Sequence, residues 1–389
     1  MGNMDVMKSF SFVFPVDIEF GVGVVSKLPD ILRKLEGKKP LLVTDKGIVG
    51  SGILGVIEDV LKTAQVGYDI FDDVSPNPRD QNVHDGAAYA RSNGNDCLIA
   101  IGGGSPIDCA KGIAVMATHG GIIQDYRGVE KIPGKTLPII SIPTTAGTGS
   151  EVTFSSVITD LKERTKFSFR SVKVASKVAL CDPELTATMP KALTAATGMD
   201  ALTHAIEGFT ANCSEPIANA VALHSIELIN KYLRRAVEDG SDIEARAGML
   251  MGSLLGAISF SHSDVAAVHC IAESLGGMYD KPHGVCNAVC LAEVMDYSKE
   301  YCIEKYARIA YAMGISFTSN EEGARAAVEA VRKLSADVGI PPFSTFGISK
   351  DQYREIAVKS FENLSNGSNP RVLSVEDYLV ILDRLGKSV

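Results

Sequence analysis

In the first half of the chain, short runs of apolar residues alternate with stretches of helical periodicity. The apolar runs predict strands over residues 40–45, 67–74, 96–102, 136–143 and 177–181. Helical periodicity lies between them, for example over residues 48–62 and 81–93. The opening segment, 10–20 with Pro15, predicts a separate extended piece or a hairpin. This alternation is typical of a mostly parallel sheet that is covered by helices on both faces.

From Thr194 onward the pattern changes, because almost every stretch has helical periodicity. Prolines interrupt these stretches at Pro190, Pro216, Pro282 and the pair Pro341 and Pro342. A chain of 389 residues is longer than chains that usually fold around a single hydrophobic core. We therefore expect an α/β nucleotide-binding domain over residues 1–188 and an all-helical domain over residues 189–389.

Composition and charge exclude several classes of protein. The net charge is −9 and no cluster of Lys and Arg stands out, which argues against a nucleic-acid-binding surface. The longest apolar stretch, 247–260, is shorter than the roughly 20 residues of a membrane-spanning helix. The first residues include Asp5 and Lys8 and lack the apolar core of a secretory signal. The eight cysteines are scattered without a Cys-x-x-Cys pair, so we expect reduced, buried thiols in a cytoplasmic protein rather than a thiolate zinc site.

A glycine-rich turn follows the predicted strand 96–102. It comprises Gly102, Gly103, Gly104 and Ser105 and leads through Pro106 into a helical pattern that carries Asp108 and Lys111. Glycine lets the backbone approach a ligand closely, and the free N–H groups at a helix start attract phosphate. The spacing is not G-x-G-x-x-G, so a plain tight turn remains the alternative.

Two further loops have the composition of a nucleotide site. Asp45 ends the strand 40–45, where an acid can bind an adenosine ribose. The segment 141–150 follows the strand 136–143 and is rich in hydroxyl groups and glycines. Open α/β sheets bind ligands at the carboxyl ends of their strands, although Ser, Thr and Gly are common in loops of any kind.

Four side chains of the helical half form a candidate metal site. Asp200 and His204 are four residues apart on one helical pattern, which places both on the same helical face. His269 and His283 are far away in sequence and can join them only through tertiary folding. One carboxylate and three imidazoles suit a divalent cation with a position left for substrate oxygen. The spacing alone leaves open that these are ordinary core or surface groups.

Taken together, these segments resemble the iron-containing (group III) alcohol dehydrogenase family. The resemblance extends over nearly the whole chain, through residues 76–78, 102–111, 141–153, 179–183, 194–209 and 268–291. Gly-Met-Asp-Ala-Leu-Thr-His-Ala-Ile-Glu (198–207) and Pro-His-Gly-Val-Cys-Asn-Ala (282–288) look like the two metal signatures of the family. The resemblance implies a dehydroquinate-synthase-like fold, with the active site in a cleft between an α/β nucleotide domain and a helical metal domain.

The resemblance also implies roles for individual residues. Asp200, His204, His269 and His283 match the iron ligands, and the cation would polarise the oxygen of an alcohol or carbonyl substrate. Asp45 matches the position that separates NAD from NADP, where an acid favours NAD. Further cofactor contacts are expected at Asn77, Gly102, Gly103, Gly104, Ser105, Asp108, Thr144, Thr145, Thr148, Lys166 and Leu180.

The chain departs from many relatives near the third histidine. Glu273 stands where they have a second histidine four residues after the ligand, so it either relays protons or ligates at the metal, or accepts a hydrogen bond beside it. The segment 261–266 also differs. Phe154, Phe260 and His262 lie in segments expected to line the substrate pocket, although a capping or buried role is the simpler interpretation of His262.

The expected function is hydride transfer between NAD and a small alcohol or diol, giving the aldehyde or ketone. The expected cation is Fe(II), with Zn(II) possible, and a homodimer is the family's usual assembly. Other enzymes on the same fold are the alternatives: a glycerol dehydrogenase-like zinc enzyme, a dehydroquinate-synthase-like lyase or a metal-free maleylacetate reductase-like enzyme. A catalytically silent NAD-binding homologue is the alternative from another class.

Overall fold

The structure is a computed structural model that describes residues 8–163 and 165–387. These residues form two compact units. One unit comprises residues 13–189 and the other comprises residues 190–387 together with residues 8–12. The first is an α/β unit, and every regular element of residues 190–387 is a helix.

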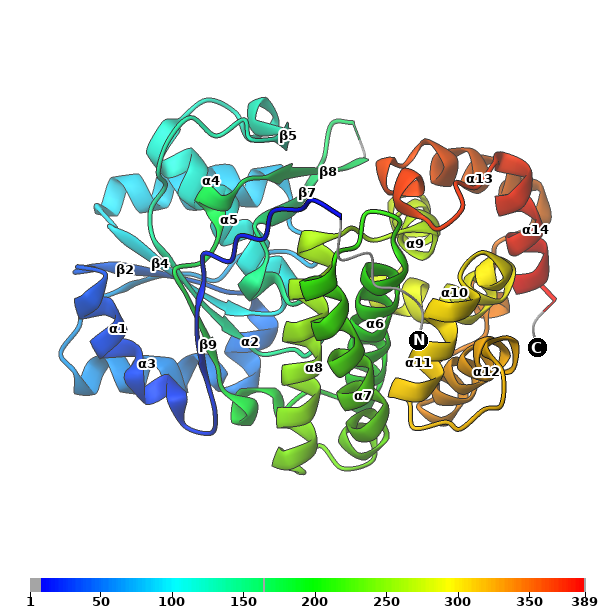
Figure 1. Ribbon diagram of the computed structural model, residues 1–389. Coiled ribbons are helices and arrows are strands. Elements are labelled where there is room, and N and C mark those ends of the chain that lie inside the picture. Colours follow the sequence, from blue (N-terminus) through cyan, green and yellow to red (C-terminus); the bar gives the residue numbers. More distant parts are fainter. Residues whose placement is uncertain (1–7, 164, 388–389) are drawn as a thin grey trace. The chain divides into compact units, whose positions relative to one another are not determined.

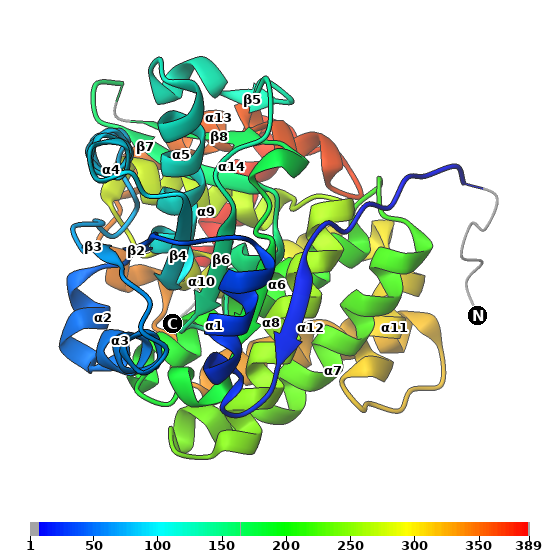
Figure 2. The same cartoon turned by 90° about the vertical axis from the view of Figure 1, so that its left-hand side faces the viewer.

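A six-stranded parallel sheet forms the centre of the described α/β unit, in the order β1-β9-β6-β4-β2-β3. Its strands are β1 (Asp17–Phe20), β2 (Pro40–Val43), β3 (Asp69–Phe71), β4 (Cys97–Gly102), β6 (Ile139–Pro143) and β9 (Val178–Cys181). The five strands predicted from apolar runs are confirmed. The opening segment makes no hairpin, because its strand β1, the blue arrow in Figure 2, pairs in parallel with β9, the last strand of the unit in sequence.

Alternate residues of the central strands face two separate cores. Leu41, Val43 and Ala100 pack against α4 (Asp80–Asn93) and α5 (Gly104–His119) on one face. Leu42 and Ile99 pack against α1 (Leu28–Lys34) and α3 (Ile53–Thr63) on the other face (Figure 1). A strand that is buried on both faces needs apolar residues at every position, which is why these strands are continuous apolar runs.

One expectation for this unit was wrong, and one feature was not foreseen. The helical stretch 48–62 is divided into α2 (Lys46–Ser51) and α3, because Gly52 between them has a φ of 83°, which no continuous α-helix accommodates. A second sheet was not predicted. It consists of β5 (Gly128–Val129), β7 (Ser155–Asp160) and β8 (Thr165–Arg170) in the order β5-β8-β7. The antiparallel pair β7 and β8 buries alternate residues, so its sequence has no continuous apolar run.

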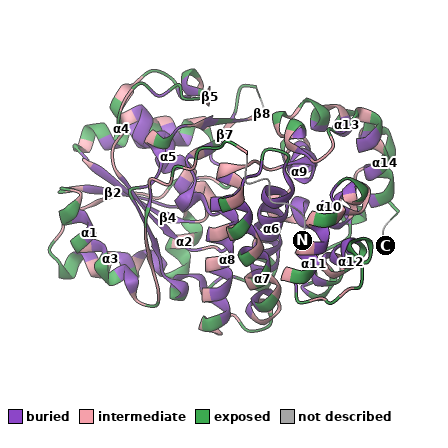
Figure 3. Cartoon of the chain, viewed as in Figure 1, coloured by how far each residue is buried: buried purple, intermediate pink, exposed green. Residues whose placement is uncertain are grey.

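The helical unit is built around long buried helices. Its α-helices are α6 (Lys191–Thr210), α7 (Pro216–Glu238), α8 (Ile243–His262), α9 (Ala267–Tyr279), α10 (His283–Ser298), α11 (Ile303–Ala312), α12 (Asn320–Asp337), α13 (Tyr353–Glu362) and α14 (Val375–Leu385). Helix α6 is buried along most of its length and packs against α7, α8 and α10 (Figure 3). Pro216 is the first residue of α7, while Pro190 and Pro282 directly precede α6 and α10, as fits residues that start helices.

Short 3₁₀ helices complete both units. They are η1 (Val24–Lys27), η2 (Ile123–Tyr126), η3 (Ser150–Val152), η4 (Val172–Val174), η5 (Pro183–Thr186), η6 (Lys299–Tyr301), η7 (Phe343–Phe346), η8 (Lys350–Gln352) and η9 (Leu364–Ser368). All eight cysteines are free, and only Cys213 among them is exposed.

Within the described residues, α8 is the one helix that is long and apolar enough to cross a membrane. The apolar stretch 247–260 lies inside this 20-residue helix, so its shortness is not the feature that argues against a membrane span. Of the most apolar window of α8, 67% is buried inside the protein, as expected for a core helix.

Candidate functional site

Three of the four predicted metal ligands converge within the helical unit. Asp200 lies on α6, His269 on the first turn of α9, and His283 is the first residue of α10. One ligand atom from each lies within 4.8 Å of the other two. Asp200 and His269 are buried, whereas 30% of the His283 side chain is exposed. Two of the three side chains are thus buried, and the third, His283, leaves one side of the cluster exposed to solvent.

The fourth predicted ligand, His204, lies beside this group. One turn of α6 separates it from Asp200, as the spacing predicts. Its ring stacks on His269, with centroids 4.7 Å apart, and on Phe260, with centroids 4.5 Å apart. The four side chains thus occupy one region of the unit, and their ligand roles remain predictions.

The charges in this region are mutually stabilising. Burial alone would raise the pKa of Asp200, but the nearby His204, His283 and His269 hold that pKa below its ordinary value. Burial would lower the pKa of His269, yet the hydrogen bond and charge of Glu207 outweigh it and raise that pKa. The arrangement keeps Asp200 ionised, and a cation would bind there with loss of the second proton of His269, because only neutral imidazole is a ligand.

Asn287, one turn after His283 on α10, points its amide nitrogen at the same group. Nδ2 lies 2.6 Å from Oδ1 of Asp200, 3.1 Å from Nε2 of His269 and 3.2 Å from Nε2 of His283. An amide has two hydrogens, so it cannot satisfy three acceptors. Its own Oδ1 is buried without a hydrogen-bond partner in the described part of the chain.

The donor set fits a divalent cation. Acceptor atoms of a carboxylate and two imidazoles face one point that a single N–H₂ group only partly satisfies. Nδ1 of His269 donates to Glu207, which leaves Nε2 of that ring as the lone-pair atom directed at Asp200 and His283. Neutral imidazole nitrogen and carboxylate oxygen are the ligands that iron(II) and zinc(II) bind.

Glu207 and Asn287 were not singled out from the sequence, although both contact the predicted ligands. Glu207 extends the series Asp200 and His204 by one further turn, and Asn287 is four residues after His283. These spacings place each residue on the same helical face as a ligand. Helical spacing from a suspected ligand was therefore a usable signal for both.

In the α/β unit, the predicted cofactor loops lie at one edge of the sheet. The neighbouring parallel strands β2, β4 and β6 end at Val43, Gly102 and Pro143. Thr44 Oγ1 donates to the Ile101 carbonyl at 2.8 Å, and the Thr144 backbone N–H donates to the Gly102 carbonyl at 3.0 Å. The strand order reverses between β2 and β4, and such a reversal is where open α/β sheets bind nucleotides.

The glycines of the turn are closely packed. A Cβ on Gly103 would lie 3.0 Å from Oγ1 of Thr145, and one on Gly104 would lie 2.9 Å from Cγ2 of Thr148. Gly102 has a φ of 145°, and a Cβ there would lie 2.6 Å from the ring of Pro106. The turn leads directly into α5, whose first N–H groups suit a phosphate. The glycine turn and the start of α5 together thus suit the pyrophosphate group of a dinucleotide.

Other predicted cofactor residues have structural partners. Asp45 caps α2 by accepting from the Ile48 backbone N–H at 3.0 Å, so it has a structural role whatever its ligand. Lys166 donates to Oδ1 of Asn77 at 2.8 Å, which brings two of the predicted residues together. Leu180 is fully buried in β9.

A buried lysine on α5 forms hydrogen bonds with residues 150–155, the segment that follows β6. Lys111 Nζ is fully buried and donates to the Ser150 carbonyl, the Thr153 hydroxyl and the Ser155 carbonyl at 2.7–2.9 Å. Asp108 faces the same interior, where it lies 3.5 Å from Lys111 and accepts from the Val157 backbone N–H at 2.9 Å. The structure therefore gives Asp108 an internal ion pair and a hydrogen bond to the backbone. Its predicted contact with the cofactor remains a prediction.

Glu151, next to this lysine, is expected to make stability depend on pH. Burial raises its pKa to about 7. The folded state thus keeps a proton that the unfolded state has lost, and stability falls as pH rises from about 4.5 to about 7. A shift of this size corresponds to about 3 kcal/mol. Urea unfolding at pH 5 and pH 8 should show this loss in the wild type and a smaller one in Glu151→Gln. Equal losses in the two proteins would contradict it.

The residues predicted to lie near the metal or the substrate each contact other side chains or the backbone. Glu273 accepts a hydrogen bond at 2.7 Å from Nδ2 of Asn363, the residue that directly follows α13. The role of Glu273 in proton transfer or metal ligation remains a prediction. His262 Nδ1 lies 2.8 Å from the Ile258 carbonyl, and its ring stacks on Phe12. Phe154 is buried in the α/β unit beneath Arg170.

Comparisons with known proteins cover nearly the whole chain. The family description "Iron-containing alcohol dehydrogenase" matches residues 15–183, and "Fe-containing alcohol dehydrogenase family, C-terminal" matches residues 194–386. A 1,3-propanediol dehydrogenase from Klebsiella pneumoniae is 40% identical over 94% of this chain and 95% of its own length. An NAD-dependent methanol dehydrogenase from Bacillus methanolicus is 36% identical over 96% of this chain and 98% of its own. The crystal structure of a 1,3-propanediol oxidoreductase superposes with a TM-score of 0.95 at 39% identity, covering 97% of this chain and all of that one.

The fold, the acid and histidine cluster, and these relatives define the class as metal-dependent alcohol oxidoreductases. The chain belongs to the iron-containing alcohol dehydrogenase family, and it is an alcohol dehydrogenase. The resemblance read from the two signature segments is confirmed, as is the fold that it implies.

Proposed function

We propose that this alcohol dehydrogenase uses NAD and iron(II) to interconvert a small alcohol or diol with its aldehyde or ketone. The observation that carries the proposal is the convergence of Asp200, His269 and His283, with ligand atoms within 4.8 Å of one another. The stacking of His204 on His269 supports a role for the fourth predicted ligand. A divalent cation bound by these residues supplies a Lewis acid for the oxygen of the substrate.

The chain's own residues would then bind and orient the reactants. The glycine turn 102–104 and the start of α5 offer backbone N–H groups to the pyrophosphate of the dinucleotide. Asp45, two residues after β2, favours NAD because a carboxylate accepts from the ribose 2′-hydroxyl and repels a 2′-phosphate. The relative from Bacillus methanolicus, an NAD-dependent methanol dehydrogenase, supports the same choice.

For the substrate we propose a short alcohol or diol. The relatives described above are named for 1,3-propanediol and methanol, and another relative, from Escherichia coli, is named lactaldehyde reductase. These names share a small oxygenated carbon skeleton. We further propose that residues 13–189 act as the nucleotide domain and residues 190–387 as the metal domain, in a cytoplasmic homodimer. The free cysteines fit a reducing compartment.

Metal analysis and a substrate screen test the proposed function together. Protein purified without chelators should contain about one iron or zinc per chain. It should oxidise at least one C2 to C4 alcohol or diol with NAD and be less active with NADP. Metal-free protein should regain activity with Fe(II) more than with Zn(II). A preference for Zn(II) and glycerol would favour the glycerol dehydrogenase-like alternative. NAD binding without turnover on any alcohol would favour the silent homologue.

A further inference from the structure

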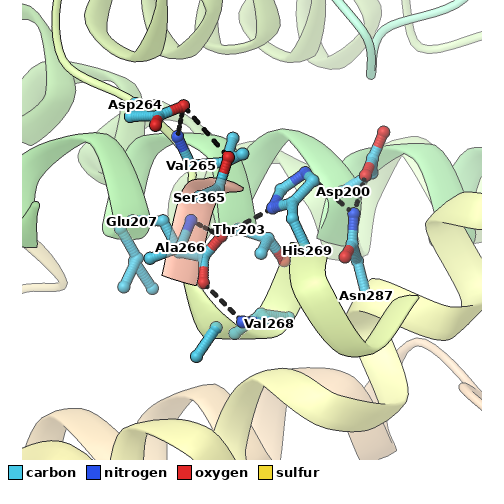
Figure 4. A network of polar contacts seen from close by, with 12 residues as sticks. Asp200, Thr203, Glu207, Asp264, Val265, Ala266, Val268, His269, Asn287 and Ser365 are labelled. Atoms are coloured by element: carbon cyan, nitrogen blue, oxygen red, sulfur yellow. Dashed lines mark hydrogen bonds and ion pairs between the residues drawn. The ribbon is translucent and has the colours of Figure 1, made fainter. Parts of the chain in front are cut away.

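A buried glutamate links two elements of the metal cluster. Glu207 lies on α6, seven residues after Asp200, and only 3% of it is exposed. Its carboxylate reaches the start of α9, where His269 lies (Figure 4). We propose that Glu207 is a positioning residue that fixes the tautomer and orientation of His269 for cation binding. This inference rests on the proposed metal site.

The carboxylate of Glu207 accepts three hydrogen bonds from this segment. Oε2 accepts from the Ala266 backbone N–H at 2.8 Å and from Nδ1 of His269 at 2.6 Å, and Oε1 accepts from the Val268 backbone N–H at 2.7 Å. A carboxylate can only accept, so Nδ1 of His269 must carry the hydrogen. Nε2 then holds the lone pair, and Nε2 is the atom near Asn287 and the other ligands.

The same carboxylate holds the backbone that carries the histidine. Ala266 is the N-cap residue of α9 and has no side-chain oxygen to cap its own helix. Glu207 supplies that cap from α6, because it binds the N–H groups of Ala266 and Val268. Since Asp200 lies on α6 as well, one helix provides a ligand and also fixes the position of another. Glu207 thus sets both the ring orientation of His269 and the place of its Cα.

A second buried glutamate offers a matched control. Glu215 is 2% exposed and caps α7 with both carboxylate oxygens, which accept from the Ile217 and Ala218 backbone N–H groups at 2.8 and 2.6 Å. It therefore has similar burial and also caps a helix, and among the described residues its carboxylate accepts from the backbone N–H groups of its own helix rather than from a histidine. Replacing either glutamate with glutamine turns one acceptor oxygen into a donor. Only Glu207→Gln removes a carboxylate charge that lies against Nδ1 of His269.

The test compares Zn(II) affinity in the wild type, Glu207→Gln and Glu215→Gln, measured by competition with a chromophoric chelator on the full metal-free chain. Loss of a carboxylate partner of a ligating histidine typically weakens metal binding 10–100-fold. We expect a dissociation constant about 10–100 times higher for Glu207→Gln and a change below about threefold for Glu215→Gln. Melting of the metal-free proteins reports the capping loss, which should be similar in the two variants.

The same measurement in the background of His269→Ala separates positioning from general damage. If Glu207 acts through His269, Glu207→Gln should change Zn(II) affinity little once that ring is gone. Equal affinity of Glu207→Gln and wild type would overturn the inference, as would an undiminished effect in the His269→Ala background. Failure of the wild type to bind Zn(II) would instead refute the proposed metal site. If Glu207→Gln does not fold, Glu207→Asp against Glu215→Asp makes the same comparison, because the shorter acid cannot span all three donors.

Discussion

Replacing His283 with alanine is expected to lower kcat/KM by about a thousandfold or more, because the cation would lose one of its ligands. The fold should tolerate the change, since 30% of this side chain is exposed and it stands at the first position of α10. The melting temperature of the metal-free protein should change by less than about 4 °C. Steady-state kinetics and metal content, measured on the same preparation, test both expectations.

His224→Ala is the matched control for this variant. His224 lies on α7, its side chain is 57% exposed, and its hydrogen-bond partner is Glu227 rather than any residue of the cluster. It should retain wild-type metal content and activity. Full activity of His283→Ala with the metal still bound would refute the ligand role of His283 and, with it, the cluster as the catalytic centre.

Replacing Gly102 with alanine should have the largest effect on cofactor binding. Its φ of 145° is rarely adopted by residues with a side chain, and a Cβ would lie 2.6 Å from the rigid ring of Pro106. Such backbone strain costs about 1–3 kcal/mol. The strain can be relieved only by moving the turn that would face the pyrophosphate. We expect NAD affinity, measured by calorimetry, to fall about tenfold or more.

Two measurements show whether this effect is local. Gly55→Ala, in the first turn of α3, is the control because nothing lies within 4 Å of its added Cβ. It should leave NAD affinity unchanged and stabilise the helix slightly. Metal content of Gly102→Ala should also equal that of the wild type, since the cluster lies in the helical unit. Unchanged NAD affinity in Gly102→Ala would contradict the assignment of the glycine turn to the cofactor.

The strands of the central sheet could be predicted from the sequence because each strand is a short, continuous run of apolar residues. A strand such as Leu98 to Ile101 is buried on both faces and must be apolar throughout. The pair β7 and β8 escaped prediction, because one side of each strand meets the core and the other is polar or exposed. The break at Gly52 escaped as well, since helical periodicity continues on both of its sides and only the backbone angle interrupts the helix.

The candidate site was predictable to a different degree for each residue. Asp200 and His204 share a helix, so their spacing placed them together. Their meeting with His269 and His283 is tertiary and followed only from the resemblance to a family. The helical spacing places Glu207 on the face of Asp200 and His204, but its contact with the start of α9 is tertiary and had no signal in the sequence. Asp45 precedes a helix, and an acid at that position predicts a cap as readily as a ribose contact.

The pairing of β1 with β9 has a consequence for synthesis of the chain on the ribosome. Residues 17–20 find their strand partners only at residues 178–181. The α/β unit therefore cannot complete its sheet until nearly all of it has left the exit tunnel, and such distant pairing slows folding. Until then the nascent chain presents the backbone edge of β6, and unpaired edges attract other chains. We expect a chain that ends before residue 178 to aggregate, whereas one that extends just past residue 189 should stay dissolved.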